Sequence, residues 1–234
     1  MWSRVVRWRG PATASAVVRG SATDLADHRN AQCAAGAAVV SRLLAFATAF
    51  AATFWLGTRL HPNSHGIPPD TLLERHPLGF VLGAWGHCDG GWFMSIADHG
   101  YNLTRAAFFP LYPALLRLLS VVLGSSSRAG VFVSLVCYSA AMVVLYRLVK
   151  ADFGSQAALW SVVLMSFAPT SFFFQAIYSE SLFLLLTLVS FSAGRRGRWL
   201  LAGAAGLLAT LTRSAGIVLV APLAWMWLEQ RRGR

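Results

Sequence analysis

Long apolar segments separated by short polar ones dominate the chain. Residues 129–146 and residues 153–179 each contain no charged side chain. A helix needs about 20 apolar residues to cross roughly 30 Å of hydrocarbon, and backbone polar groups in lipid must be satisfied within the segment that carries them. The pattern therefore predicts membrane-spanning helices.

We expect about four to six such spans. The first covers residues 36–57, where Arg42 lies near the cytoplasmic end and can extend its guanidinium group to the polar interface. The next three predicted spans cover 129–149, 155–174 and 177–194. Arg213 divides the apolar run 199–228 into halves of about 14 residues, each only ~21 Å long as a helix. That run predicts either a hairpin of two short helices or one long kinked helix.

Residues 58–128 interrupt this regular pattern. They begin with a segment rich in proline, glycine and asparagine, residues 61–70, which cannot be the interior of a helix. The apolar segment 108–123 contains two prolines and Arg117, so it favours a helix lying at the membrane surface over a spanning one. We therefore predict a long loop that contains short juxtamembrane helices.

Composition excludes a soluble protein. Hydrophobic residues make up 56% of the chain and charged residues only 12%, whereas soluble domains carry roughly 25% charged residues. A lipid bilayer accepts an apolar exterior, so the fold class that we predict is an all-α polytopic membrane protein.

The formal net charge of +11 suggests a nucleic-acid partner at first sight. The basic side chains are scattered, however, and flank apolar runs instead of forming one stripe, so we predict no nucleic-acid binding. Lysine and arginine beside membrane spans mark cytoplasmic ends. Most of the basic groups fall in the first 35 residues, at Arg147 and Lys150, at 195–198 and at the end of the chain.

This charge distribution predicts the domain organisation and the sidedness. Residues 1–35 form a cytoplasmic basic tail, residues 36–228 the transmembrane domain, and residues 229–234 a basic C-terminal end. The loop 58–128 and the short loop 174–180 then lie on the outer or luminal side. The outer side collects most of the candidate polar side chains: Asp89, Asp98, His99, Arg105, Arg117, Tyr178, Glu180 and Arg213. Polar residues near membrane depth are costly and usually functional.

The three cysteines, Cys33, Cys88 and Cys137, are scattered and form no CxxC pair. We predict neither a structural zinc site nor a disulfide framework. Cys33 and Cys137 are expected to be small buried hydrophobic residues. The sequence leaves open whether a divalent metal ion takes part, since one or two carboxylates can hold Mg²⁺ through water.

Four motifs occur in order along the chain: 85–101 (WGHCDGGWFMSIADHGY), 107–113 (AFFPLYP), 178–183 (YSESLF) and 211–216 (LTRSAG). Together they resemble the PIG-V family, the proteins similar to GPI mannosyltransferase 2, which is part of the GT-C class of membrane glycosyltransferases. The resemblance covers about residues 36–228. It implies a GT-C-like helical bundle with a long first outer loop.

The resemblance also implies a reaction. A mannosyl group would be transferred, with inversion, from a polyprenyl or dolichyl phosphate to a lipid or glycan acceptor. The acid of the first outer loop matches Asp89, which glycines flank, so the backbone there can approach a sugar closely. A carboxylate within reach of an acceptor hydroxyl is a suitable general base. Arg105, Arg117 and Arg213 are candidates to bind the donor phosphate.

The remaining candidates have competing interpretations. Trp85 and Trp92 offer flat faces to a sugar or an isoprenoid, but interfacial aromatic residues, Tyr178 among them, are also ordinary membrane-belt residues. Asp89 could instead cap a helix that starts near Trp92, because aspartate favours N-caps. Glu180 could cap or anchor a span, and Arg213 could anchor a helix end. For Asp98 and His99 the alternative is a solvated loop position.

Two departures from the family pattern qualify the expectation. His87 and Cys88 precede Asp89 where the family usually has an aromatic residue before the acid. The chain also has about half the usual length of the family, so it resembles an N-terminal half-length member. The alternative is therefore a truncated, inactive membrane protein, or one subunit of a split enzyme whose partner polypeptide supplies further helices. The location implied is the bacterial plasma membrane or the endoplasmic reticulum.

Overall fold

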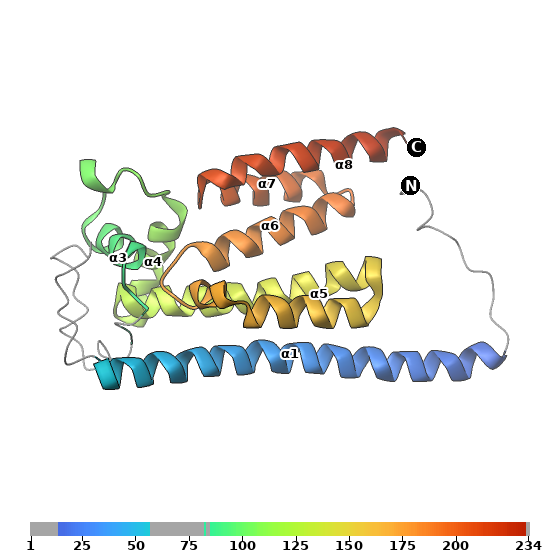
Figure 1. Cartoon of the computed structure of the whole chain (residues 1–234). Helices are drawn as coiled ribbons and strands as arrows, with labels where there is room; N and C mark the ends of the chain where they lie inside the picture. Colours follow the sequence, from blue (N-terminus) through green and yellow to red (C-terminus); the bar gives the residue numbers. More distant parts are fainter. Residues whose placement is uncertain (1–13, 57–81, 83–84, 233–234) are drawn as a thin grey trace.

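The computed structural model describes residues 14–56, 82 and 85–232, and these residues form helices and turns without a strand (Figure 1). The predicted all-α class is thus confirmed. The α-helices are α1 (Ala14–Leu56), α3 (Asp89–His99), α4 (Leu111–Leu123), α5 (Ser126–Phe167), α6 (Glu180–Arg195), α7 (Trp199–Thr210) and α8 (Val220–Arg232). Short 3-10 helices are η2 (Leu103–Arg105), η3 (Pro169–Phe174) and η4 (Ser214–Leu219).

Helix α5 folds back on itself and contains two of the predicted spans. Gly154 has φ 85° and ψ 172°, a conformation that glycine adopts without steric cost. The hydroxyl groups of Tyr138 and Ser166, 28 residues apart, are separated by only 2.7 Å. The first leg (126–153) and the second leg (155–167) are therefore antiparallel. The second leg ends before the predicted boundary at 174, because proline at 169 disfavours helical geometry in the residue before it.

The C-terminal run forms two short helices, as one of the two interpretations of residues 199–228 expected. Helix α7 turns at residues 211–213 and the chain returns through η4 and α8 (Figure 1). Helix α7 is rich in alanine and glycine and packs closely on α6, where Ser190 Oγ donates to the Ala202 carbonyl at 2.8 Å. Small residues allow this close approach of helix backbones.

The bundle has two chemically different ends. One, which we name the basic end, holds the junction of the two α5 legs, the α6–α7 turn and the end of α8. Its basic side chains are Arg29, Arg147, Lys150, Arg195, Arg196, Arg198, Arg231 and Arg232. The opposite end, the site end, holds α3, α4, the loop 175–179 and the turn 211–213. A backbone hydrogen bond of 3.1 Å from Leu111 to Leu211 joins α4 to that turn.

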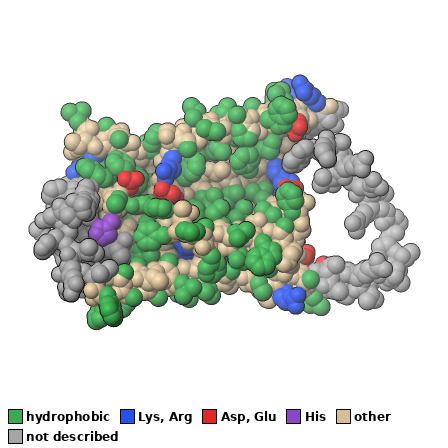
Figure 2. All heavy atoms as spheres, in the orientation of Figure 1, with side chains coloured by type: hydrophobic (Ala, Val, Ile, Leu, Met, Phe, Trp, Pro, Cys, Tyr) green, Lys and Arg blue, Asp and Glu red, His purple; other side chains and the backbone are tan. Residues whose placement is uncertain are grey.

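The sides of the bundle between these ends are apolar. Large hydrophobic side chains such as Leu200, 90% exposed, and Trp55, 81% exposed, point away from the core. Figure 2 shows hydrophobic side chains along the bundle and most basic side chains toward its ends. By length and composition, Asp24–Ala52 and Ser126–Phe167 are long and apolar enough to cross a membrane. Such a surface suits lipid better than water.

Helix α1 differs from expectation at its start. It begins at Ala14, not at residue 36, so residues 14–35 are helical; residues 1–13 lie outside the described part of the chain. Asp27 pairs with Lys150 at 2.7 Å, which binds this segment to the first α5 leg. Cys33, expected to be buried, is exposed on α1, whereas Cys137 is buried as expected.

Arg42 does not extend to an interface at the cytoplasmic end, as the sequence suggested. Its side chain is only 6% exposed. Its guanidinium group donates to the carbonyls of Ser171 at 2.7 Å and Ser166 at 3.2 Å, and lies 4.4 Å from the centre of the Tyr138 ring. The break between α5 and η3 leaves carbonyls without helical partners, and Arg42 satisfies them.

Candidate functional site

Asp89 lies at the start of α3 on a strained turn. Gly90 N donates to the His87 carbonyl at 3.1 Å, which closes the turn around Cys88 and Asp89. Cys88 has φ 53° and ψ −124°, a left-handed conformation that non-glycine residues rarely adopt. Cys88, not Asp89, is the N-cap, and no side chain caps the helix there. The exposed Asp89 carboxylate is therefore available for another role.

The loop 175–178 supports this turn from the other half of the chain. Ile177 N donates to the Trp85 carbonyl at 2.8 Å, and Tyr178 Oη donates to the His87 carbonyl at 3.1 Å. On the far side of the loop, Ser134 Oγ of the first α5 leg donates to the Ala176 carbonyl at 2.7 Å. The loop thus connects the Asp89 turn to the centre of the bundle.

Two glycines make this close packing possible. A Cβ atom on Gly90 would lie 3.2 Å from the Ile177 carbonyl oxygen, and one on Gly130 would lie 2.3 Å from Ile177 Cγ2. The second distance is far inside van der Waals contact. The loop can lie against α3 and α5 only because both positions lack a side chain.

We expect Gly130→Ala to displace the loop and to lower stability by about 1–3 kcal/mol, the usual cost of overpacking. Thermal unfolding of the purified protein in detergent measures the change. Because the collision is with the Ile177 side chain, the double variant Gly130→Ala with Ile177→Ala should lose less stability than the two single variants together. Losses that simply add would contradict this packing.

Tyr178 lies between the two carboxylates of the site. Burial, reinforced by the neighbouring Cys88 thiol and the charge of Asp89, raises the pKa of its hydroxyl, and Glu180 adds to the rise. All of these effects keep the proton on the oxygen. Tyr178 therefore remains a hydrogen-bond donor to the His87 carbonyl across the physiological pH range.

Glu180 and Arg213 form an ion pair between Glu180 Oε1 and Arg213 Nη1. Glu180 is the first residue of α6, where a negative charge favours the helix dipole. Arg213 lies on the turn between α7 and η4. Both side chains are partly exposed, so the guanidinium group keeps donors that a bound anion could use.

The structure brings together one group of the predicted site residues: Asp89, Tyr178, Glu180 and Arg213. It does not bring Asp98 into that group, because nine residues along α3 separate it from Asp89 by about 14 Å. Asp98 instead accepts a hydrogen bond of 2.9 Å from Ser126 at the start of α5. His99 lies exposed at the same end of α3.

The other two predicted phosphate ligands have surroundings of their own. Arg105 is buried in η2, and its guanidinium group donates to the Gly100 carbonyl at 3.1 Å, so it fixes the loop that follows α3. Arg117 lies exposed on α4. Of the three arginines that we considered, Arg213 is the one that forms an ion pair with Glu180.

The two tryptophans differ sharply in exposure. Trp85, expected to present a face to substrate, is only 1% exposed and packs between Phe46 at 5.3 Å and Phe172 at 5.1 Å, measured between ring centres. It holds α1 and η3 together at the site end. Trp92 is partly exposed and stacks on Phe108 with ring centres 6.1 Å apart, so it keeps the expected role as a candidate.

The described residues contain no group of three His, Cys, Asp or Glu side chains that could hold a metal ion. A metal ion held through water molecules would use the two carboxylates of the site group, Asp89 and Glu180.

Sequence reasoning missed the contacts that position Asp89. Neither the role of Gly130 nor the hydrogen bond from Ser134 to the loop has a local signal, since 42 residues separate Ser134 from Ala176. A serine within this largely apolar segment was the available clue, because hydroxyl groups inside membrane helices can bond to another helix.

Comparison with known proteins adds independent evidence. Residues 105–234 match the family model described as dolichyl-phosphate-mannose-protein mannosyltransferase. The GPI mannosyltransferase pigv-1 of Caenorhabditis elegans is 28% identical over 226 residues, covering 80% of this chain and 33% of the relative. The GPI alpha-1,6-mannosyltransferase 2 of Cricetulus griseus is 33% identical over 165 residues, covering 64% of this chain and 32% of the relative.

The human GPI alpha-1,6-mannosyltransferase 2 is 31% identical over 163 residues, covering 62% of this chain and 33% of the relative. The chain thus spans about a third of the length of the curated relatives that it matches. No solved structure matches it.

The apolar bundle and these matches define the class: a helical membrane protein similar to membrane glycosyltransferases. The chain belongs to the dolichyl-phosphate-mannose-protein mannosyltransferase family, and its relatives confirm the resemblance to PIG-V proteins of the GT-C class.

Proposed function

We propose that the protein transfers mannose from a polyprenyl- or dolichyl-phosphate donor to a hydroxyl group of a lipid or glycan acceptor. The observation that carries the proposal is the exposed Asp89 carboxylate on a rigid turn, grouped with Tyr178 and the Glu180–Arg213 pair. The names of the relatives favour a glycosylphosphatidylinositol precursor as the acceptor.

Asp89, Arg213 and Tyr178 each have a defined role in this reaction. Asp89 takes the proton of the acceptor hydroxyl while its oxygen attacks the anomeric carbon of the mannose. The bond from that carbon to the phosphate oxygen breaks, and both electrons leave with the lipid phosphate. Arg213 stabilises the charge of the departing phosphate. Tyr178 and the loop 175–178 hold the turn that carries Asp89.

The test is transfer of labelled mannose from synthetic polyprenyl-phosphate mannose into a lipid-extractable or glycan product, measured in membranes that contain the protein. Membranes from the same host without the protein give the background. We expect transfer above that background from the lipid-phosphate donor. Transfer that stays at background after the chain is co-expressed with the remainder of a relative would favour the alternative, an inactive membrane protein.

We also propose that the chain crosses the membrane several times, with the site end on the outer or luminal face and the basic end in the cytoplasm. The clustering of basic side chains at one end of the bundle supports this orientation.

Cys88 offers a direct test of sidedness, since its thiol is exposed beside Asp89 while Cys137 is buried. In a Cys33→Ser background, a membrane-impermeant maleimide should label Cys88 in intact cells or from the lumen of sealed microsomes. The variant that also carries Cys88→Ser should lose this labelling. Labelling of Cys88 only from the cytoplasmic side would contradict the proposed orientation.

A further inference from the structure

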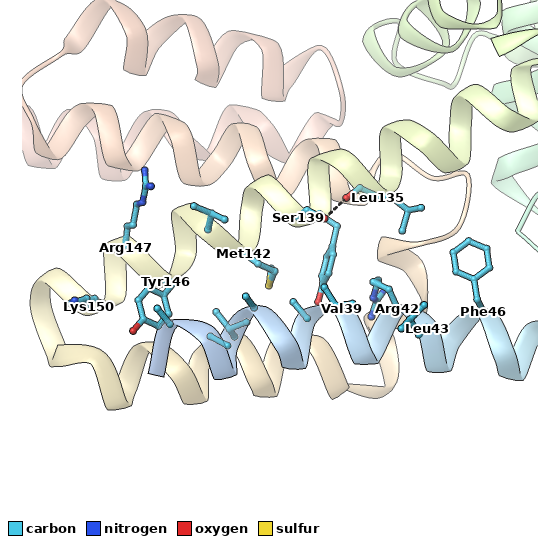
Figure 3. A pocket seen from close by; sticks show the side chains of 17 residues that line it. Val39, Arg42, Leu43, Phe46, Leu135, Ser139, Met142, Tyr146, Arg147 and Lys150 are labelled. Carbon is cyan, nitrogen blue, oxygen red and sulfur yellow. Dashed lines mark hydrogen bonds between the residues drawn. The ribbon is translucent and has the colours of Figure 1, made fainter. Parts of the chain in front are cut away.

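A groove of about 730 Å³ runs between α1 and the first leg of α5 (Figure 3). Its volume lies within the ~300–1,000 Å³ that is typical of ligand-binding pockets. Small side chains of α1, including Ala31, Ala35 and Ala38, leave the space open. Leu135, Met142 and Val143 line the opposite wall. The groove is therefore largely apolar.

The dimensions of the groove favour a single hydrocarbon chain. Its lining extends along α1 from Ala31 to Phe46, a rise of about 22 Å. The groove is thus long relative to its volume of about 730 Å³, as a cavity for one extended chain would be.

Charge is concentrated at one mouth of the groove. Arg147 and Lys150 line the end nearest Ala31, at the basic end of the bundle, and in Figure 3 the Arg147 side chain extends from the rim of the groove away from α1. Asp27 pairs with Lys150 at 2.7 Å and offsets one of the two positive charges. Arg42, the other basic lining residue, already donates to the carbonyls of Ser171 and Ser166. A ligand would therefore place a negative group at this mouth and its apolar part further along.

We infer that this groove binds one acyl chain of an anionic glycerophospholipid, taken from the leaflet on the basic side of the membrane. The phosphate lies at the mouth beside Arg147, and the chain runs between α1 and α5 toward Phe46. Anionic headgroups are attracted by basic side chains at the membrane surface. The inference does not depend on the proposed reaction.

The site geometry separates this lipid from a sugar donor. Gly130 of the first α5 leg is the residue that contacts Ile177 beside the Asp89 turn. Arg147 follows it by 17 residues on the same leg, which is about 26 Å along the helix. A phosphate at Arg147 is therefore too distant to be the leaving group of a reaction at Asp89.

The experiment counts retained lipid by native mass spectrometry. Purified, delipidated protein is incubated with palmitoyl-oleoyl phosphatidylglycerol or with palmitoyl-oleoyl phosphatidylcholine. We expect one phosphatidylglycerol per chain, at a lipid concentration where phosphatidylcholine is retained several-fold less. Val143→Trp fills the groove and should reduce phosphatidylglycerol retention at least tenfold. Val136→Trp is the matched control, because Val136 lies outside the groove on the same leg with 49% exposure against 50% for Val143.

Arg147→Gln tests the headgroup contact separately. It should weaken retention of phosphatidylglycerol by about fivefold, the attraction of one basic side chain for an anionic surface, and leave that of phosphatidylcholine unchanged. Equal retention of phosphatidylglycerol by Val143→Trp and Val136→Trp would overturn the inference. So would equal retention of both lipids by the unmodified protein, or displacement of phosphatidylglycerol by equimolar polyprenyl phosphate.

Discussion

Asp89→Asn should lower the rate of mannosyl transfer by a factor of about 100 to 10,000, the usual contribution of a positioned general base. The amide keeps the size and most of the hydrogen bonds of the carboxylate, but it cannot accept the acceptor proton. Because the side chain is exposed and caps no helix, the bundle should remain intact. Initial rates with labelled lipid-phosphate mannose, normalised to the amount of protein in the membrane, measure the effect.

Asp98→Asn is the matched control for this experiment. It makes the same chemical change on the same helix, about 14 Å away, and asparagine can still accept the hydrogen bond from Ser126. We expect transfer to stay within about threefold of the unmodified protein, since surface changes away from a site usually have small effects. If both variants lost transfer activity equally, the cause would be a change in the fold of α3. Asp89 would then have no part in the chemistry.

Arg213→Gln should raise the KM for the donor by about tenfold to 150-fold. A hydrogen bond to a charged group contributes roughly 1.5–3 kcal/mol, and the change removes a cation that meets the phosphate. The increase in KM should lie near the upper limit of this range, because the Glu180 carboxylate would then remain unpaired and repel the donor phosphate. Donor saturation curves in membranes or detergent provide the measurement.

Two further variants separate phosphate binding from a purely structural ion pair. If Arg213 binds the donor, Glu180→Gln should reduce activity little, and adding it to Arg213→Gln should restore part of the affinity for the donor. If the pair only held α6 to α7, each single variant would affect the donor KM and stability alike. Arg117→Gln is the control, because Arg117 is exposed on α4. A larger increase in the donor KM for Arg117→Gln than for Arg213→Gln would indicate that Arg117 binds the phosphate.

Hydrophobic periods and charge spacing predicted most of the helices, because membrane spans depend on local composition. The two legs of α5 and the hairpin after residue 198 follow from that signal. The predicted start of α1 was wrong by more than twenty residues, because the polar first part of this helix is stabilised by distant partners. Lys150 and Ser155 supply those partners to Asp27 and Asn30, and no local pattern records them.

The site was predictable only in part for a related reason. Asp89 and Arg213 could be selected because each is an isolated charge in an apolar or glycine-rich setting. Whether a tryptophan presents its face to substrate or lies within the core depends on tertiary packing. Trp85 is buried by Phe46 and Phe172, residues that are 39 and 87 positions away from it in the chain.

The buried Arg42 fixes how the bundle can respond to membrane thickness. The candidate span of α1, Asp24–Ala52, has 29 residues and a length of about 44 Å, so its polar first part extends beyond a hydrocarbon core of roughly 30 Å. A free helix would change its tilt independently when the bilayer thickness changes. Sliding α1 past α5 would strip Arg42 of the Ser166 and Ser171 carbonyls. Helix α1 must therefore tilt together with its neighbours, so a thinner bilayer reorients the Asp89 turn as part of one rigid body.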